Sequence, residues 1–261
     1  MTIRILALGD VVGKTGTEYL CRPDVLPSFK QKEKIHFVIA NGENSAAGNG
    51  LSVASANALF DAGVDVITGG NHTWQKKEVY SMLDDDRRLV RPANFPGAAP
   101  GEGYTIADVM GYRILVFNLS GNAFMTEPVA SSFEWADRIL EENKGKYDVS
   151  VLDFHAETTS EKILMGWNLD GRASAVYGTH THVQTADARV LPNGTGYITD
   201  VGMCGSMNGV LGIKTECIRH KFTVHTPVRF EEAVGDEHAH GAVFDIDPST
   251  GRCLGVKEVR F

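Results

Sequence analysis

Carboxylate, amide and imidazole side chains gather in five short segments of this 261-residue chain. The segments are Gly9-Asp10, Asn41-Gly42-Glu43-Asn44, Gly70-Asn71-His72, Asp153-Phe154-His155 and Gly178-Thr179-His180-Thr181-His182. Such oxygens and imidazole nitrogens are the donors that divalent transition metals take from proteins. The four imidazoles and the accompanying oxygens are enough to hold two ions, so the residue types predict a metal centre.

Each polar segment follows an apolar, strand-like run. The runs lie near residues 3–8, 36–40, 64–68, 149–153 and 173–177. In open α/β sheets the functional crevice lies outside the carboxyl ends of the strands. We therefore expect the five segments, which span roughly 170 residues of sequence, to converge in space.

The spacing of the histidines supports this expectation. His180 and His182 are one residue apart at a strand end, where the period of two points both imidazoles to the same side. Asp10 alone would more often be a helix cap or a turn residue than a ligand. His155 alone could equally be a core histidine satisfied by Asp153 or by a backbone carbonyl. The other segments favour the ligand role for both.

Strand-like and helical stretches alternate through most of the chain. We expect strands near 3–9, 35–40, 64–68, 112–119, 149–153, 173–178 and 196–199, and helices near 15–31, 52–62, 74–84, 131–143 and 159–169. After about residue 219 the pattern changes to short β-rich segments at 220–227, 240–247 and 255–261. The pattern predicts an α/β fold with flanking helices and an antiparallel C-terminal portion, which we expect to be a single domain over 1–261. The Pro- and Gly-rich loop 92–103 is the best candidate for an internal boundary.

Composition excludes several classes of protein. The chain is 43% hydrophobic, and no window approaches the roughly 18 apolar residues of a membrane span. The formal net charge of -8 argues against non-specific binding to duplex nucleic acid, which depends on basic side chains. The N-terminus shows no secretory signal and the four cysteines lack CxxC spacing, so we expect reduced thiols and a cytoplasmic location.

One motif is misleading. The segment from Gly9 to Thr15 follows a strand and opens a helix, as a phosphate-binding P-loop does. That motif needs four residues between its glycines, whereas three separate Gly9 from Gly13. The spacing argues against a nucleoside triphosphatase.

Five blocks of the sequence together resemble a known family. They are Gly-Asp-Val-Val-Gly, Asn-Gly-Glu-Asn-Ser-Ala-Ala-Gly-Asn-Gly, Gly-Gly-Asn-His-Thr-Trp, Asp-Phe-His-Ala-Glu and Gly-Thr-His-Thr-His-Val-Gln-Thr-Ala-Asp. In this order they resemble the motifs of the YmdB-like branch of the calcineurin-like metallophosphoesterases. The resemblance implies the layered β-sandwich fold of that superfamily.

The resemblance also implies the metal ligands. One ion would be held by Asp10, Glu43, Asn44 and His182, and the other by Glu43, Asn71, His155 and His180. The chain departs from the wider superfamily at two points, both typical of this branch. Val12 stands where most members have a histidine, for which Asn44 looks like the replacement, and Glu43 replaces the usual bridging aspartate.

Charge and ligand type narrow the chemistry. Two divalent ions carry four positive charges, while two carboxylates and a bridging hydroxide carry three negative ones, which leaves one positive charge for a phosphodiester. The mixture of imidazole and oxygen ligands suits Mn, Fe, Zn or Co better than Mg or Ca. We expect two divalent ions per chain, with Fe or Mn first and Zn or Co as alternatives.

The predicted activity is hydrolysis of 2′,3′-cyclic nucleotides to nucleoside 3′-phosphates, as the resemblance implies. His72 follows ligand Asn71 and would act as the general acid that protonates the leaving oxygen; the alternative is a residue that only orients a ligand. Asn94 and Phe95 are weaker candidates for contacts to a base.

Two other functions remain open at this point. A phosphomonoesterase or nucleotidase would use the same metals, and a metal-stabilised RNA-binding regulatory protein would bind them without turnover. We expect a small phosphodiester or nucleotide as substrate, no duplex nucleic acid, no membrane, and a homo-oligomer. The glycine-rich stretch 200–212 is assigned no role.

Overall fold

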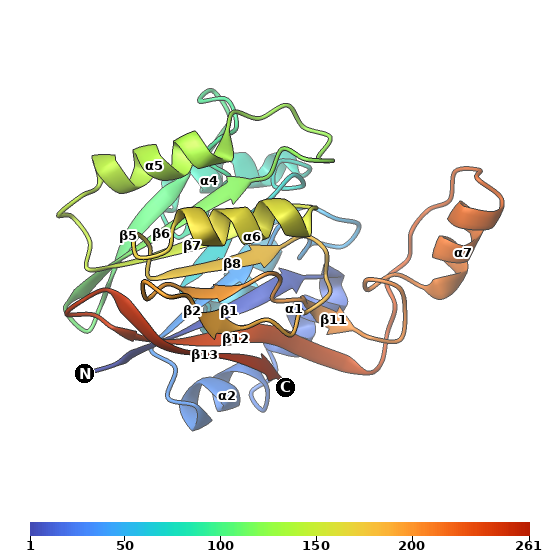
Figure 1. The fold of residues 1–261 in the computed structure, drawn as a ribbon. Helices are drawn as coiled ribbons and strands as arrows, with labels where there is room; N and C mark the ends of the chain where they lie inside the picture. The colour runs from blue at the N-terminus through green and yellow to red at the C-terminus, as the bar shows by residue number, and fades with distance from the viewer.

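The computed structural model describes residues 1–261 as two β-sheets packed face to face, with helices on the outer faces (Figure 1). The strands are β1 Ile3–Val11, β2 Phe37–Asn41, β3 Val66–Thr68, β4 Leu89–Val90, β5 Tyr104–Val109, β6 Tyr112–Ser120, β7 Val149–His155, β8 Ala175–Thr179, β9 Arg189–Val190, β10 Gly196–Ile198, β11 Met203–Ser206, β12 Glu237–Asp247 and β13 Arg252–Arg260. The helices are α1 Gly13–Leu20, α2 Leu26–Lys32, α3 Val53–Asp61, α4 Tyr80–Asp85, α5 Ser132–Glu142, α6 Thr159–Asn168 and α7 Thr215–Thr223, with a 3-10 turn η1 at Lys77–Val79. The predicted layered α/β class is confirmed.

The two sheets have a mostly parallel centre. The seven-stranded sheet runs β13-β12-β11-β1-β2-β3-β4, and the six-stranded sheet runs β5-β6-β7-β8-β10-β9. Strands β1, β2 and β3 are parallel to one another, as are β6, β7 and β8. Strands β12 and β13 form an antiparallel pair, and β12 also pairs antiparallel with β1. The expected antiparallel C-terminal portion is therefore present, as part of the first sheet.

Alternation along β1 shows how the layers pack. Ile3, Ile5 and Ala7 belong to the core between the sheets, which also takes side chains from β6, β7 and β8. Leu6 and Leu8 point the other way, into the core beneath α1, α3 and α4. A third core lies between the second sheet and helices α5 and α6. Because both faces of each sheet are covered, the central strands are apolar on both faces and the polar residues stand at their ends.

The helix expected at 15–31 is wrong as a single element. It is divided into α1 and α2 by turns at 21–25. Pro23 lies in this interval, and a proline both lacks an N–H group and disfavours helical backbone in the residue before it. The helix expected at 74–84 is likewise reduced to η1 and α4. Four short strands, β4, β5, β9 and β11, were not predicted.

The strand expected at 220–227 is also wrong. These residues form the end of α7 and the loop after it, on a segment that projects from the sandwich (Figure 1). The alternation of polar and apolar residues there resembles a strand, but α7 buries none of its residues and no neighbouring strand pairs with it. The strands expected at 240–247 and 255–261 correspond to β12 and β13.

The loop 92–103 connects the two sheets. It leaves β4, the last strand of the first sheet, and enters β5, the first strand of the second. No helix of the structure combines the length and the apolar character that crossing a bilayer would need.

Candidate metal centre

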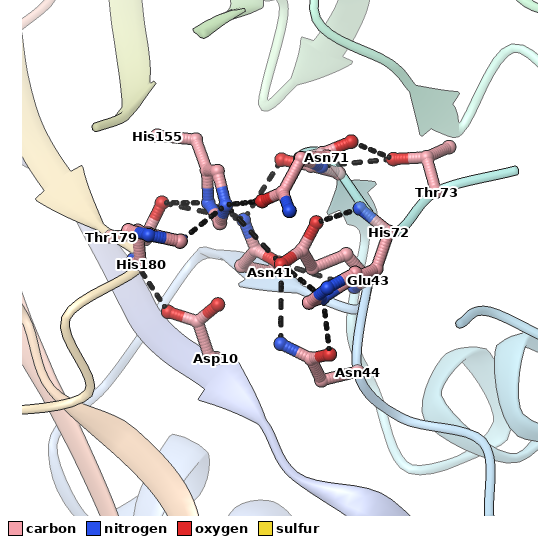
Figure 2. Close-up of polar contacts among 12 residues, drawn as sticks. Asp10, Asn41, Glu43, Asn44, Asn71, His72, Thr73, His155, Thr179 and His180 are labelled. Atoms are coloured by element: carbon pink, nitrogen blue, oxygen red, sulfur yellow. Dashed lines mark hydrogen bonds and ion pairs between the residues drawn. The ribbon is translucent and has the colours of Figure 1, made fainter. Parts of the chain in front are cut away.

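The five polar segments meet where the carboxyl ends of strands from both sheets come together (Figure 2). Strand β1 carries Asp10, and the turns after β2 and β3 carry Glu43 and Asn71. From the second sheet, β7 ends on His155 and the turn after β8 carries His180. Convergence is therefore a property of the fold, because parallel strands bring their carboxyl ends to one edge.

One group of donors centres on His155. Its Nε2 lies 3.2 Å from Glu43 Oε1 and 3.1 Å from both Asn71 Oδ1 and His180 Nδ1. Donor atoms of Glu43, His155 and His180 all lie within 4.8 Å of one another. Four groups expected to share one ion are thus gathered around a single point.

A second group centres on Asp10. Its Oδ1 lies 3.6 Å from His182 Nε2, and its Oδ2 accepts a hydrogen bond from the backbone N–H of His180 at 2.9 Å. Asp10 is fully buried, and neither its Oδ1 nor the Nδ1 of His182 has a hydrogen-bond partner. Buried polar atoms are rarely left unpaired. These two orphaned atoms indicate a missing partner.

Glu43 belongs to the His155 group, acts through its charge to raise the pKa of Asp10, and is joined to His72. Oε2 accepts the backbone N–H of His72 at 2.7 Å, and Oε1 lies 3.3 Å from His72 Nδ1 and 3.2 Å from Asn44 Nδ2. His72 Nδ1 also lies 3.0 Å from Asn44 Oδ1. The His72 side chain is 28% exposed, whereas Glu43 is fully buried, so His72 stands at the open side of the cluster.

A hydrogen-bond network behind the donors sets their orientation. Thr179 Oγ1 donates to Asp153 Oδ1 at 2.7 Å and lies 3.0 Å from His155 Nδ1. If Nδ1 carries the proton, as this contact favours, then Nε2 presents its lone pair to the site. His180 is held in a similar way, because its Nε2 lies 3.0 Å from Glu157 Oε2 while Nδ1 faces the cluster.

Sequence reasoning missed the orienting roles of Thr179, Glu157 and Asn41. Asn41 Nδ2 donates to Gly69 O at 3.0 Å and to Asp153 Oδ2 at 3.2 Å, across the two sheets. Their place in the sequence could have indicated these roles, since each is a polar residue that lies within two residues of a proposed metal ligand or at the end of a buried strand.

The electrostatics of the cluster favour a cation. Burial would raise the pKa of Glu43, but His155 and His72 beside it hold that pKa well below its usual range. Burial would lower the pKa of His155, but Glu43, Asp10 and Asp153 raise it to about 9. Burial and the neighbouring His155 lower the pKa of His180 to about 4. The buried carboxylates thus favour positive charge at this point, which a bound metal ion would supply while His155 stays neutral.

The residues fit divalent metal ions. The donor set consists of carboxylate and amide oxygens with imidazole nitrogens, and two buried donor atoms lack partners. At Gly70 an added Cβ would lie 2.3 Å from Glu43 Oε2 and 2.4 Å from His155 Nε2, so glycine keeps the space between these donors free. The backbone at His180 and His182 has φ of 94° and 62°, a strained conformation that clusters at functional sites.

Two weaker candidates lie elsewhere. Asn94 is buried, with Nδ2 donating to Ser120 O at 2.8 Å and Ala130 O at 2.9 Å and Oδ1 accepting from Ser120 N, so it braces a loop and cannot also bond a base. Phe95 packs against Trp74 with ring centroids 4.6 Å apart. In the stretch 200–212, Gly202 O accepts the backbone N–H of Asp10 at 3.2 Å, which brings this stretch against the centre.

Comparisons with known proteins agree with the geometry. A family model described as YmdB-like protein matches residues 6–259. The 2′,3′-cyclic-nucleotide 2′-phosphodiesterase of Bacillus subtilis is 47% identical over 257 residues, which cover 98% of this chain and 96% of that protein. The crystal structure of a protein described as a novel phosphatase from Mycoplasma pneumoniae superposes with a TM-score of 0.93 at 33% identity, covering 100% of this chain and 94% of the other.

A more distant likeness concerns the fold alone. The 5′-nucleotidase precursor of Thermus thermophilus superposes with a TM-score of 0.57 at 12% identity, covering 100% of this chain and 54% of the other. The metallophosphoesterase sandwich predicted from the five blocks is thus shared with proteins of very different sequence.

Proposed function

The chain belongs to the YmdB-like family of the metallophosphoesterases, and from that premise we propose that it is a phosphodiesterase that converts 2′,3′-cyclic nucleotides to nucleoside 3′-phosphates. The observation that carries the proposal is the pair of donor groups around His155 and Asp10, with Glu43 in the first group and near enough to Asp10 for its charge to act to raise the pKa of that carboxyl. This arrangement suits an enzyme that binds a phosphodiester between two metal ions.

In this proposal one ion is held by Asp10, Glu43, Asn44 and His182, and the other by Glu43, Asn71, His155 and His180. Two divalent ions held there would activate a water molecule as the nucleophile and stabilise the charge that develops on the phosphate oxygens. The ligand types favour Fe or Mn, with Zn or Co as alternatives. The contacts of His155 and Asp10 with their neighbours support this division of the ligands.

His72 is the proposed donor of a proton to the leaving oxygen. His72 is tied through Nδ1 to Glu43 and Asn44, and its Nε2 makes no hydrogen bond to the protein. At the partly exposed edge of the cluster, Nε2 is the group available to give a proton to the departing 2′-oxygen. Breaking the bond to that oxygen leaves the phosphate on the 3′-oxygen, as the proposed product requires.

We also propose that residues 1–261 work as one domain, because neither sheet carries a complete ligand set. Asp10 and Glu43 come from the first sheet, and His155 and His180 come from the second. Assembly into a homo-oligomer stays a prediction that gel filtration would check.

Turnover of three substrates by metal-loaded protein tests the proposed function. We expect 2′,3′-cyclic AMP to be opened to 3′-AMP and bis-p-nitrophenyl phosphate to be cleaved, with p-nitrophenyl phosphate the poorest substrate. Faster turnover of the monoester would instead make the protein a phosphomonoesterase, the activity that the description of the Mycoplasma pneumoniae protein suggests. Two bound metals without turnover of any substrate would favour the regulatory alternative.

A further inference from the structure

A buried ion pair next to the centre has no part in the chemistry described so far. Lys162 Nζ on α6 donates to Asp200 Oδ2, just after β10, at 2.6 Å, and each side chain is only 1% exposed. Removing two charges from water is so costly that a buried ion pair is weak grounds for stability. Its presence therefore calls for another explanation.

The Asp200 carboxylate is hydrogen-bonded to the histidine segment and is linked through Gly202 to the strand that carries Asp10. Oδ2 accepts the side-chain hydroxyl of Thr181 at 2.7 Å and its backbone N–H at 3.3 Å, and Thr181 lies between the two histidines. Oδ1 accepts the backbone N–H of Gly202 at 2.8 Å. The carbonyl of Gly202 in turn accepts the N–H of Asp10. One carboxylate thus anchors the segments that carry three proposed ligands.

Strain in the histidine segment explains why an anchor is needed. His180 and His182 both have positive φ, which residues with side chains adopt only where the surroundings hold them. Thr181 is the residue between them, and its two hydrogen bonds both end on Asp200. Without that anchor the segment would relax, and the imidazoles would leave their present directions.

The chain makes room for the lysine beneath this segment. Gly178 lies at the end of β8, two residues before His180, and a Cβ there would lie 2.8 Å from Lys162 Cδ. It would also meet the carbonyl of Thr199 at 2.0 Å. The glycine allows the lysine stem to pass under the strand end and to neutralise Asp200 where water cannot reach it.

We propose that Lys162 and Asp200 are positioning residues that hold Asp10, His180 and His182 in the arrangement that binds metal. This inference rests on the proposed metal centre. Asp200 is not itself a ligand, because Oδ2 already receives three hydrogen bonds and Oδ1 receives one. The positive charge of Lys162 favours the ionised form of the Asp200 carboxylate, which accepts the hydrogen bonds from Thr181 and Gly202.

The double variant Lys162→Met/Asp200→Asn separates positioning from stability. It removes both buried charges, so the melting temperature of the metal-free protein should largely recover relative to either single variant. An asparagine cannot accept hydrogen bonds at both former oxygens, so one ligand segment is still released. We expect Mn²⁺ to bind the double variant about tenfold or more weakly than the wild type in calorimetric titrations. Recovery of wild-type Mn²⁺ affinity together with the melting temperature would overturn the proposal.

A milder variant decides the question if the double variant does not fold. Thr181→Val removes only the hydroxyl bonded to Asp200 Oδ2, and it should weaken Mn²⁺ binding with little change in the melting temperature of the metal-free protein. Thr185→Val is the control, because Thr185 Oγ1 bonds the carboxylate of Asp187 and the backbone of Asp200 but not the Asp200 carboxylate. Equal Mn²⁺ affinities for these two variants would overturn the proposal. Because the readout is metal binding, failure of diester turnover in the wild type would contradict the proposed function alone.

Discussion

At the scale of single residues, the histidines of the centre differ in burial and in the groups that they contact. His155 is fully buried and the side chain of His182 is 13% exposed, and the Nε2 atom of each faces a carboxylate oxygen. His72 is tied to Glu43 on one edge and open on the other, with 28% of its side chain exposed. Histidine can therefore bind a metal ion inside the cluster and donate a proton at its exposed edge.

Replacing His72 by alanine should separate proton donation from metal binding. We expect His72→Ala to keep about two metals per chain and to lose about 10²–10⁴-fold in rate on a 2′,3′-cyclic nucleotide, whose leaving alkoxide needs a proton. The loss should be mild on bis-p-nitrophenyl phosphate, because p-nitrophenolate leaves without help. His155→Ala serves as the contrast, since it should lower the metal content measured by atomic absorption. Equal losses of rate on both substrates would make His72 an orienting residue instead.

At the scale of elements, strand ends and the turns after them build the site. Strands β1, β2 and β3 deliver oxygens and β7 and β8 deliver imidazoles, and the sheets face each other so that the two sets meet. The turns are constrained by close contacts. The turn after β3 passes so near Glu43 and His155 that only glycine fits at position 70.

Gly70→Ala tests this close approach. The added methyl group would lie within 2.4 Å of Glu43 Oε2 and His155 Nε2, so one donor must move and we expect bound metal and activity to fall at least tenfold. Gly97→Ala is the control, because a Cβ at Gly97 has no heavy atom within 4 Å. Metal content and turnover rate of the two variants would be compared directly. A Gly70→Ala protein with a full complement of metal would show that the turn tolerates a side chain.

At the scale of the whole molecule, the sandwich buries titratable groups that the site does not use. His240 lies on β12, and both of its ring nitrogens are buried without a hydrogen-bond partner. Burial, with Arg260 and His238 nearby, lowers the pKa of His240 to about 4. His240 therefore stays neutral in the folded protein at a pH where the same side chain in the unfolded chain, with its pKa near 6.5, is already protonated.

This difference predicts a pH-dependent loss of stability. Since the folded-state pKa is the lower one, stability from neutral His240 is complete above pH 6.5 and is lost as the pH falls from 6.5 towards 4. We expect a contribution on the order of 1 kcal/mol, because His240 as a whole residue is only partly buried and solvent screens part of the effect. Urea unfolding at pH 7 and pH 5 would measure it. His240→Phe should lose less stability than the wild type over this interval, and identical losses would rule out His240 as the source.

Local patterns in the sequence predict much of the fold and of the candidate site. The alternation of strand and helix, the apolar runs and the polar residues at their ends depend on neighbours in the chain, so they predict the layered fold and the convergence of Asp10, Glu43 and His155. They fail where a local pattern is ambiguous. Pro23 divides an apparently continuous helix, and the alternation at 220–227 has no sheet to join.

Only the tertiary structure decides which distant groups meet. The bond from His180 to Asp10 joins residues 170 positions apart, and the bond from Asn41 to Thr179 joins residues 138 positions apart. The pairing of Lys162 with Asp200 likewise depends on how α6 packs over the second sheet. The residue types and their order along the strands are properties of the sequence alone. Their distances, their orienting partners and the space kept open at Gly70 arise from the packing of two sheets, which no local pattern encodes.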